Sequence, residues 1–294
     1  MGGALDIGNY LLGGLYSNFE QMERAHITRT IPVDTTIPVK FDLQLNQQTN
    51  VVLSQDVTIN NALVTVNTGG LNIKTAGMVH MKCDMAGGAA VLGTMQLIAD
   101  LQLPYRVTAI VPACENSVDA NSFLPSDVIG SYSGHSIEII DTDAEGRLIL
   151  ADALHYAKRY KPELVLEFST LTGAAAAAIG PMGIVCMGDV PDKTRKALHD
   201  AGDQVYERLA EFPFWEEYDE WIKSDIADIK NVGGPYAGAI TAGRFLNHFV
   251  DYPYMHFDIA APAFNKSNDS YRVKNGTGVG VRLLFEYIKK LAGK

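Results

Sequence analysis

From about residue 74 onward, the chain alternates short apolar runs typical of buried strands with longer segments of helical periodicity. The strand-like runs include LVLEFSTL, GIVCMGD and MHFDIA, and the helical segments include RLILADALHYAKRYK, GAITAGRFLNHFV and GVGVRLLFEYIKKL. Strands that alternate with helices of this length favour a layered α/β fold, because each crossover helix packs on a face of the sheet. We therefore expect a central mixed, largely parallel β-sheet flanked by helices on both faces.

Two further elements of this pattern have definite expected bounds. The apolar run RVTAIVPAC predicts a strand over residues 106–114. The segment DKTRKALHDAGDQVYERLAEF predicts a single amphipathic helix over residues 192–212.

The first part of the chain has a different character. Residues 1–30 predict a short amphipathic helix weakened by glycines, whereas residues 31–73 are rich in Val, Ile, Thr and Asn that alternate between apolar and polar. We therefore expect an atypical N-terminal segment over residues 1–67, a short helix followed by a β-rich stretch. A second, larger domain is expected over residues 68–294.

The composition narrows the class of function. The 294-residue chain carries a formal net charge of -10, which argues against nucleic acid as a partner because phosphate binding needs a basic surface. No apolar run reaches the roughly 18 residues of a membrane-spanning helix, so no membrane partner is expected. The start of the chain lacks a basic signal-peptide region, and the three cysteines lack metal-binding or disulfide spacing. These features predict a cytoplasmic protein.

The run DTDAEGRL, residues 141–148, places three carboxylates and an arginine between a predicted strand and a predicted helix. One interpretation is helix capping. In TDAE, Thr142 or Asp143 would be the N-cap, and Glu145 stands three residues after Thr142. The other is a divalent-cation site, because Asp143 and Glu145 supply the oxygen ligands that such metals prefer. Arg147 would then hold an anion beside the metal. Spacing alone leaves both interpretations open.

A second group of charged residues lies upstream, in GGLNIKTAGMVHMKCDMAGGAA. Lys74 begins this loop and Asp84 ends it, just before a helix that opens on small residues. A single lysine is usually solvated, and an aspartate before a helix is usually a cap. Taken alone, each residue therefore carries little functional weight.

Together these stretches resemble the leucine aminopeptidase (cytosol aminopeptidase) family. The family's hallmark run, Asn-Thr-Asp-Ala-Glu-Gly-Arg, stands here as DTDAEGR, and the resemblance continues through TGGLNIK, MKCDMAGGAA, STLTGA, WIKSDIADIKN and MHFDIAAPAF. It covers about residues 68–291. The resemblance implies a metal-dependent aminopeptidase that releases N-terminal, leucine-type amino acids from peptide substrates. It also implies a homo-oligomer, a hexamer, with two divalent metals (Mn or Zn) in each subunit.

The resemblance also implies roles by motif position. Asp84, Asp143 and Glu145 correspond to metal ligands. Lys74 corresponds to the catalytic lysine that polarises the substrate carbonyl and stabilises the oxyanion. Arg147 corresponds to the arginine that holds a bicarbonate, which acts as a general base.

The STLTG stretch corresponds to the wall around that anion and the substrate, so the resemblance implies substrate- or anion-binding roles for Thr170, Leu171 and Gly173. Such a site is chemically reasonable, because two neighbouring metals can activate water and bind the free amine and carbonyl of a peptide.

The chain departs from the family in its first metal motif. Aligned on TGG, the stretch NNALVTVNTGG has Ala62 where the family has a lysine ligand, and Asn67 where it has a bridging aspartate. Asn67 can still offer a neutral carbonyl oxygen, whereas Ala62 offers no ligand. We therefore expect one metal or none, and an impaired aminopeptidase. The alternative is a catalytically inactive homologue with a structural or binding role.

Overall fold

The computed structural model of the chain describes residues 78–114, 116 and 122–293. The predicted N-terminal segment over residues 1–67 lies outside the described residues, as do Ala62, Asn67 and Lys74. The helices are η1 (Met78–Met85), α2 (Ala86–Asp100), α3 (Gly146–Ala157), η2 (Lys158–Tyr160), α4 (Gly173–Ile179), η3 (Gly180–Met182), α5 (Asp192–Gln204), η4 (Glu216–Ile222), α6 (Gly238–Asn247) and α7 (Val281–Leu291). The strands are β1 (Val128–Gly130), β2 (Ser136–Glu138), β3 (Val165–Ser169), β4 (Ile184–Asp189), β5 (Leu209–Glu211), β6 (Ile229–Lys230), β7 (Tyr254–Asp258), β8 (Phe264–Asn265) and β9 (Asn275–Gly276).

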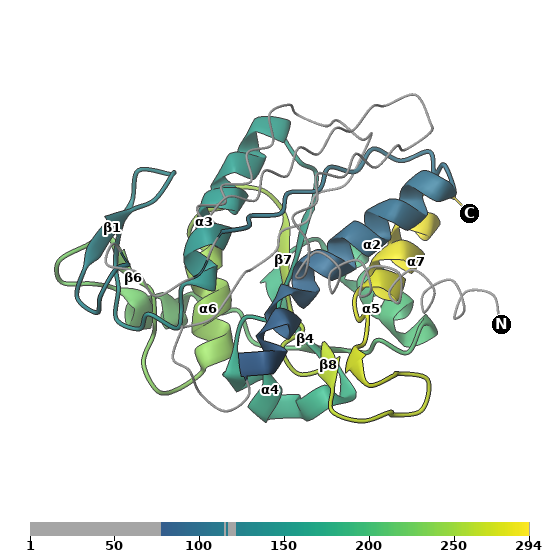
Figure 1. Ribbon diagram of the computed structural model, residues 1–294. Helices are drawn as coiled ribbons and strands as arrows, with labels where there is room; N and C mark the ends of the chain where they lie inside the picture. The colour runs from purple at the N-terminus through teal and green to yellow at the C-terminus, as the bar shows by residue number, and fades with distance from the viewer. Residues whose placement is uncertain (1–77, 115, 117–121, 294) are drawn as a thin grey trace, which may run out of the picture.

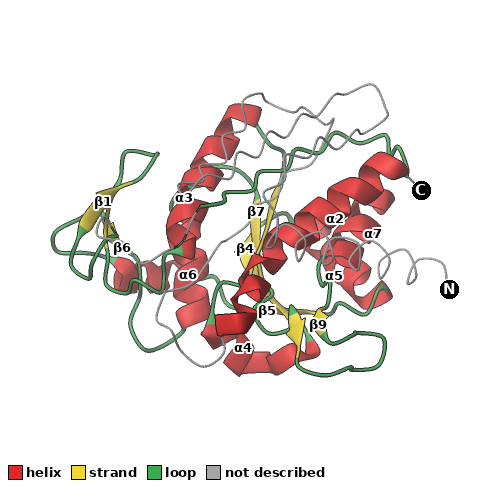
Figure 2. Cartoon of the chain, viewed as in Figure 1, coloured by secondary structure: helices red, strands yellow, loops and turns green. Residues whose placement is uncertain are grey.

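Four strands form the central sheet, in the order β3-β7-β4-β5. Strand β3 runs parallel to β7 and β4 runs parallel to β5, while β7 and β4 are antiparallel. Helices α3 and α6 lie on one side of this sheet, and α2, α5 and α7 lie on the other (Figures 1 and 2). The expected mixed, largely parallel sheet with helices on both faces is therefore confirmed.

Strand β3 shows how the sequence builds both faces of this sheet. Its residues VLEFS are all buried. Leu166 and Phe168 enter the core that includes residues of α2, α5 and α7, and Val165 enters the core that includes residues of α3 and α6. Because side chains alternate along a strand, Glu167 and Ser169 share the α3–α6 face with Val165. Polar groups are therefore buried on that face, towards the carboxyl end of the strand.

The predicted helix over residues 192–212 is wrong in its second half. Helix α5 ends at Gln204, and Tyr206 has a φ of +60°, a left-handed conformation that interrupts a helix. The chain then continues as β5. The predicted strand over residues 106–114 is also wrong, since Val107 forms only an isolated bridge and no strand is present there.

Glu207, three residues after the end of α5, stabilises the start of the last helix, α7. Its buried carboxylate accepts hydrogen bonds from the backbone N–H of Gly280 at 3.1 Å and of Leu283 at 3.0 Å. It also pairs with Arg282 at 2.9 Å. A carboxylate beside the free N–H groups at a helix start is favourable, so this tertiary contact competes with continuation of α5.

Replacing Glu207 with alanine is expected to lower the free energy of unfolding by about 2–4 kcal/mol, because two buried N–H groups and the partly exposed Arg282 lose their partner. Chemical denaturation followed by circular dichroism measures the change. The exposed Glu216 on η4 provides the control, and its replacement with alanine should change stability by less than about 0.5 kcal/mol. Equal effects from the two variants would contradict the proposed role of Glu207.

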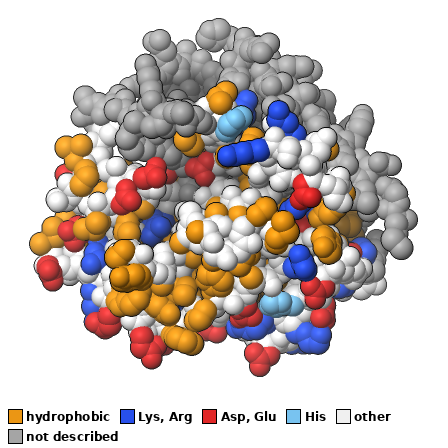
Figure 3. Space-filling model, turned by 90° about the horizontal axis from the view of Figure 1, so that it is seen from below, with side chains coloured by type: hydrophobic (Ala, Val, Ile, Leu, Met, Phe, Trp, Pro, Cys, Tyr) orange, Lys and Arg blue, Asp and Glu red, His pale blue; other side chains and the backbone are white. Residues whose placement is uncertain are grey.

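None of the described helices is long and apolar enough to span a membrane. The described surface nevertheless exposes large aromatic side chains, among them Trp215, Trp221 and Tyr236. Both tryptophans contact Tyr218, with ring centroids 6.1 and 5.3 Å apart. Figure 3 shows a face of the molecule on which hydrophobic side chains gather between charged ones. Exposed apolar groups that cluster in this way are typical of contact surfaces.

Candidate active site

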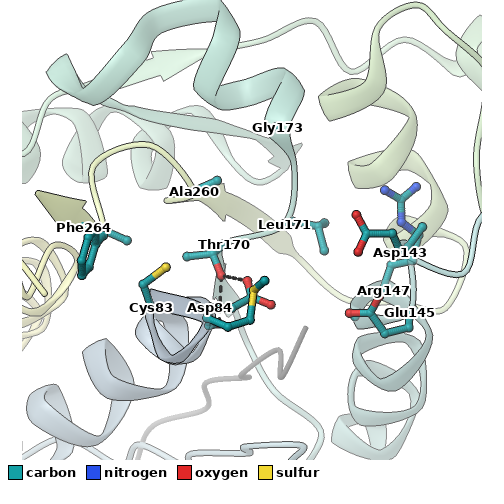
Figure 4. A pocket seen from close by; sticks show the side chains of 14 residues that line it. Cys83, Asp84, Asp143, Glu145, Arg147, Thr170, Leu171, Gly173, Ala260 and Phe264 are labelled. Atoms are coloured by element: carbon teal, nitrogen blue, oxygen red, sulfur yellow. Dashed lines mark hydrogen bonds between the residues drawn. The ribbon is translucent and has the colours of Figure 1, made fainter. Parts of the chain in front are cut away.

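A pocket of about 300 Å³ lies where the loops that follow β3 and β7 meet the beginnings of α2, α3 and α4. Ligands of α/β proteins commonly bind at this carboxyl edge of the sheet. Seven residues singled out in the sequence line the pocket: Asp84, Asp143, Glu145, Arg147, Thr170, Leu171 and Gly173 (Figure 4). The pocket therefore unites three motifs that are far apart in the sequence.

The loop that carries the acidic run is fixed by Asn231, a fully buried residue that follows β6. Its side-chain amide donates to the carbonyl oxygens of Asp141 at 2.7 Å and Ala144 at 3.3 Å. Its amide oxygen accepts from the backbone N–H of Ile140 at 2.8 Å. Sequence reasoning missed Asn231, although it ends the quoted motif WIKSDIADIKN. The available signal was only a polar residue directly after a short strand.

The capping interpretation of TDAE is wrong. The N-cap of α3 is Glu145, which has helical dihedral angles and no side-chain capping hydrogen bond. The backbone N–H of Asp143 instead donates to the side chain of Asp141 at 2.9 Å, which closes a local turn. The side chain of Glu145 therefore forms no capping hydrogen bond, and both Asp143 and Glu145 line the pocket.

Arg147 lies in the first turn of α3 and is 6% exposed. One guanidinium nitrogen, Nη1, donates to the backbone oxygen of Asn231 at 2.7 Å. Its Nε is buried and has no hydrogen-bond partner among the described residues. Burial lowers the pKa of Arg147 to about 10, against the opposing charges of Asp258, Asp141 and Glu145. At neutral pH the side chain is therefore a buried cation with donor capacity to spare, suited to holding an anion.

Asp84 is the second-last residue of η1, two residues before the start of α2. The N-cap of α2 is Met85, without a side-chain capping bond, so the capping explanation for Asp84 is not supported. The hydroxyl of Thr170 contacts the Asp84 carboxylate (Figure 4). The same hydroxyl lies 2.9 Å from the backbone carbonyl oxygen of Asp84. This contact joins the loop after β3 to the start of α2.

The small-residue start of α2 allows this contact. A Cβ atom at Gly87 would overlap the carbonyl oxygen of Phe168 in β3. Only glycine therefore lets the helix approach the strand so closely. Gly87 of the AGGAA stretch is thus required by packing, and the close approach places Asp84 beside the carboxyl end of β3.

Cys83 also lines the pocket and raises the alternative of a cysteine nucleophile. Burial, together with the neighbouring Asp84 carboxylate, raises the pKa of the Cys83 thiol. Reactive cysteines instead have a lowered pKa, because the thiolate is the nucleophile. The raised pKa therefore argues against a thiolate nucleophile at Cys83.

The carboxylates of Asp84, Asp143 and Glu145 suit hard divalent cations in their chemistry. Within the described residues, however, no group of three or more His, Cys, Asp or Glu could hold a metal ion. Figure 4 shows Asp84 beside Thr170 on one side of the pocket, with Asp143 and Glu145 on the other. The donor types thus fit a metal, but the described carboxylates do not by themselves complete a metal cluster.

The fold and the pocket define an α/β domain whose site, lined by carboxylates and an arginine, lies at the carboxyl edge of its sheet. Over residues 62–285 the chain matches the catalytic domain of the cytosol aminopeptidase family. The chain belongs to this family, which confirms the resemblance noted in the sequence.

Individual relatives agree. A probable cytosol aminopeptidase of Geobacter sulfurreducens is 47% identical over 228 residues, which cover 77% of this chain and 46% of that protein. The bottromycin maturation enzyme BotP in complex with Mn has a TM-score of 0.73 and 33% identity, and the match covers 80% of this chain and 54% of the BotP chain. A mutant of tomato leucine aminopeptidase has a TM-score of 0.68 and 37% identity, and the match covers 79% of this chain and 45% of the tomato chain. The chain spans about half the length of the relatives it matches.

Proposed function

We propose that this chain provides the catalytic domain of a metal-dependent aminopeptidase that releases N-terminal, leucine-type amino acids from peptides, with impaired turnover. The observation that carries the proposal is the convergence of Asp84, Asp143, Glu145 and Arg147 in one pocket. They come from separate motifs, and their buried cation and carboxylates match the chemistry that peptide hydrolysis requires. Membership of the cytosol aminopeptidase family supports the same reaction class.

The proposed cofactor is a divalent metal, Mn²⁺ or Zn²⁺, and a solved structure of BotP is described as a complex with Mn. A bound metal would activate water and polarise the peptide carbonyl. The proposed ligands are Asp84, Asp143, Glu145 and Asn67. We propose one metal or none, because Ala62 has no donor atom and Asn67 is neutral. The family match begins at residue 62, so both positions lie within the matched region.

The chain's own side chains have separate proposed tasks. Lys74 is proposed to bind the substrate carbonyl and stabilise its developing negative charge. Arg147 is proposed to hold a bicarbonate ion through the donor capacity left at its buried guanidinium. Thr170, Leu171 and Gly173 are proposed to form the wall that positions substrate and anion, since all three line the pocket.

The wider context of the proposal follows from the family and the surface. We propose a cytoplasmic homo-oligomer, a hexamer, that acts on peptides and binds neither nucleic acid nor membranes. The exposed aromatic side chains around Tyr218 support a subunit contact, and the net charge of -10 disfavours nucleic acid. The proposed domains remain an atypical segment over residues 1–67 and a catalytic domain over residues 68–294.

One assay tests the reaction and the impairment together. The purified chain is incubated with a chromogenic leucine amide and added Mn²⁺ or Zn²⁺, and the metal content per chain is measured in parallel. We expect slow leucine release that requires added metal and stops with a chelator. A rate equal to that of a full-length family enzyme would contradict the impairment, and two metals per chain would contradict the proposed loss of ligands.

The alternative is an inactive homologue with a structural or binding role, favoured by Ala62 and Asn67 at ligand positions. The same assay separates the two proposals. No leucine release under any metal condition, in a chain that is folded by circular dichroism, would establish the inactive homologue.

A further inference from the structure

A buried carboxylate outside the proposed mechanism joins the two loops that border the pocket. Asp258 ends β7, is 1% exposed, and lies opposite Ser169 of β3 in the parallel register. Its Oδ1 accepts hydrogen bonds from the backbone N–H groups of Leu171 and Ala260, both at 3.1 Å. Its Oδ2 accepts from the hydroxyl of Thr172 at 2.7 Å. One side chain therefore fixes the loop that follows its own strand and the loop that follows the neighbouring strand.

These bonds continue to the far wall of the pocket. Thr172 is the N-cap of α4, and its oxygen accepts from the N–H of Ala175 at 3.0 Å while its proton goes to Asp258. The hydroxyl of Thr170, in the same loop, contacts Asp84. A continuous series of contacts thus runs from Asp258 through the loop to the candidate metal ligand Asp84.

The surroundings of Asp258 partly offset the cost of burying its carboxylate. Burial raises the pKa of Asp258, while the charge of His256 and the hydrogen bond from Thr172 oppose that rise. Burial in turn lowers the pKa of His256, but the charge and hydrogen bond of Glu167, together with the charge of Asp258, leave that pKa raised. Arg147 is attracted to Asp258 from the pocket side. Glu167, His256, Asp258 and Arg147 therefore form a group of alternating charge in which each partly compensates its neighbour.

We infer that Asp258 is a positioning residue, which holds the loop over residues 170–172 and through it sets the orientation of Asp84. The inference deepens the proposed function, because it makes metal affinity depend on a residue that does not touch the metal. The mechanical link between Asp258 and Asp84, however, exists whether or not the chain binds a metal. The two ideas can therefore be tested separately.

Hydrogen exchange measured by mass spectrometry tests the link without metal. In Asp258→Asn we expect exchange to become about tenfold faster in peptides covering residues 170–173 and 78–85, as for the loss of one hydrogen bond to a charged group. In Thr170→Val the change should be confined to residues 78–85. The double variant should match Asp258→Asn over residues 78–85, because both substitutions break one series of contacts.

Glu286→Gln is the matched control, since Glu286 is a buried carboxylate on α7, away from the loop. It should leave exchange over residues 78–85 unchanged. If Asp258→Asn does not fold, Thr172→Val removes one of the bonds to Asp258 and should accelerate exchange in the same two peptides by a few-fold. Unchanged exchange over residues 78–85 in every folded variant of Asp258 or Thr172 would overturn the inference.

Titration with Mn²⁺ alone, followed by calorimetry, provides the second readout. We expect Asp258→Asn to weaken Mn²⁺ binding by about tenfold. Adding Thr170→Val to Asp258→Asn should cause no further loss of Mn²⁺ affinity. Coupled exchange in a chain that binds no Mn²⁺ would uphold the positioning role and count against the proposed metal-dependent function. Mn²⁺ binding that is equally tight in Asp258→Asn and in the unchanged protein would overturn the role of Asp258 in orienting Asp84.

Discussion

Replacing Glu145 with alanine is expected to lower the affinity for Mn²⁺ by about 100-fold or more and to abolish leucine release. Glu145 lines the pocket from the start of α3 and does not act as a helix cap through its side chain. Its removal should therefore leave the helix intact while it removes a carboxylate oxygen from the candidate metal site. Changing a residue that only supports a ligand commonly weakens metal binding by about 10- to 100-fold, so loss of a ligand itself should exceed that range.

The exposed Asp203 of α5 is the matched control, since its replacement with alanine removes the same charge far from the pocket. Calorimetric titration and the leucine amide assay should show no change for this variant. Thermal unfolding of both variants should agree within a few degrees with that of the unchanged protein. Full Mn²⁺ affinity in Glu145→Ala would show that DTDAEGR is not part of the metal site.

The sequence predicted three of the four strands of the central sheet because their signals are local, whereas it placed β5 inside a helix. The runs that became β3, β4 and β7 are short, apolar and bounded by loops, and the helices between them keep their periodicity. The error at the end of α5 has a tertiary cause. Glu207 and Tyr206 continue a helical pattern, but the Glu207 carboxylate stabilises the start of α7, 73 residues further along the chain. A contact of that range is not visible in local periodicity.

The candidate site likewise contains residues that were predicted from local motifs and residues that were missed because their partners are distant in the sequence. The residues with a recognisable motif, such as Asp84 and Arg147, were predicted, and the structure places them in one pocket. The residues that hold these motifs in place were missed. Asn231 acts on a loop about 90 residues away, and Asp258 contacts loop residues 86 and 87 positions away. Both resemble ordinary polar residues at strand ends, and only the register of neighbouring strands reveals their partners.

Restoring the two departures from the family motif should have the opposite effect to removing Glu145. In the chain with Ala62→Lys and Asn67→Asp, we expect Mn²⁺ occupancy to rise from at most one to two ions per chain. The lysine supplies a nitrogen ligand, and the aspartate supplies the negative charge that a neutral amide cannot offer to a dication. Affinity for the added ion should rise by about 100-fold or more, and leucine release should rise with it.

The control for this restoration is Asn61→Asp, which adds the same negative charge to the same stretch at a position that the alignment does not assign to a ligand. It should change neither Mn²⁺ occupancy nor leucine release. Because Glu145 is proposed to bind the same ions, Glu145→Ala should cancel the gain when added to the restored chain. If the restored chain binds no additional Mn²⁺, positions 62 and 67 do not occupy the family's ligand positions. If it binds two ions but releases no leucine, the impairment lies in another catalytic residue, and Lys74 is then the first position to test.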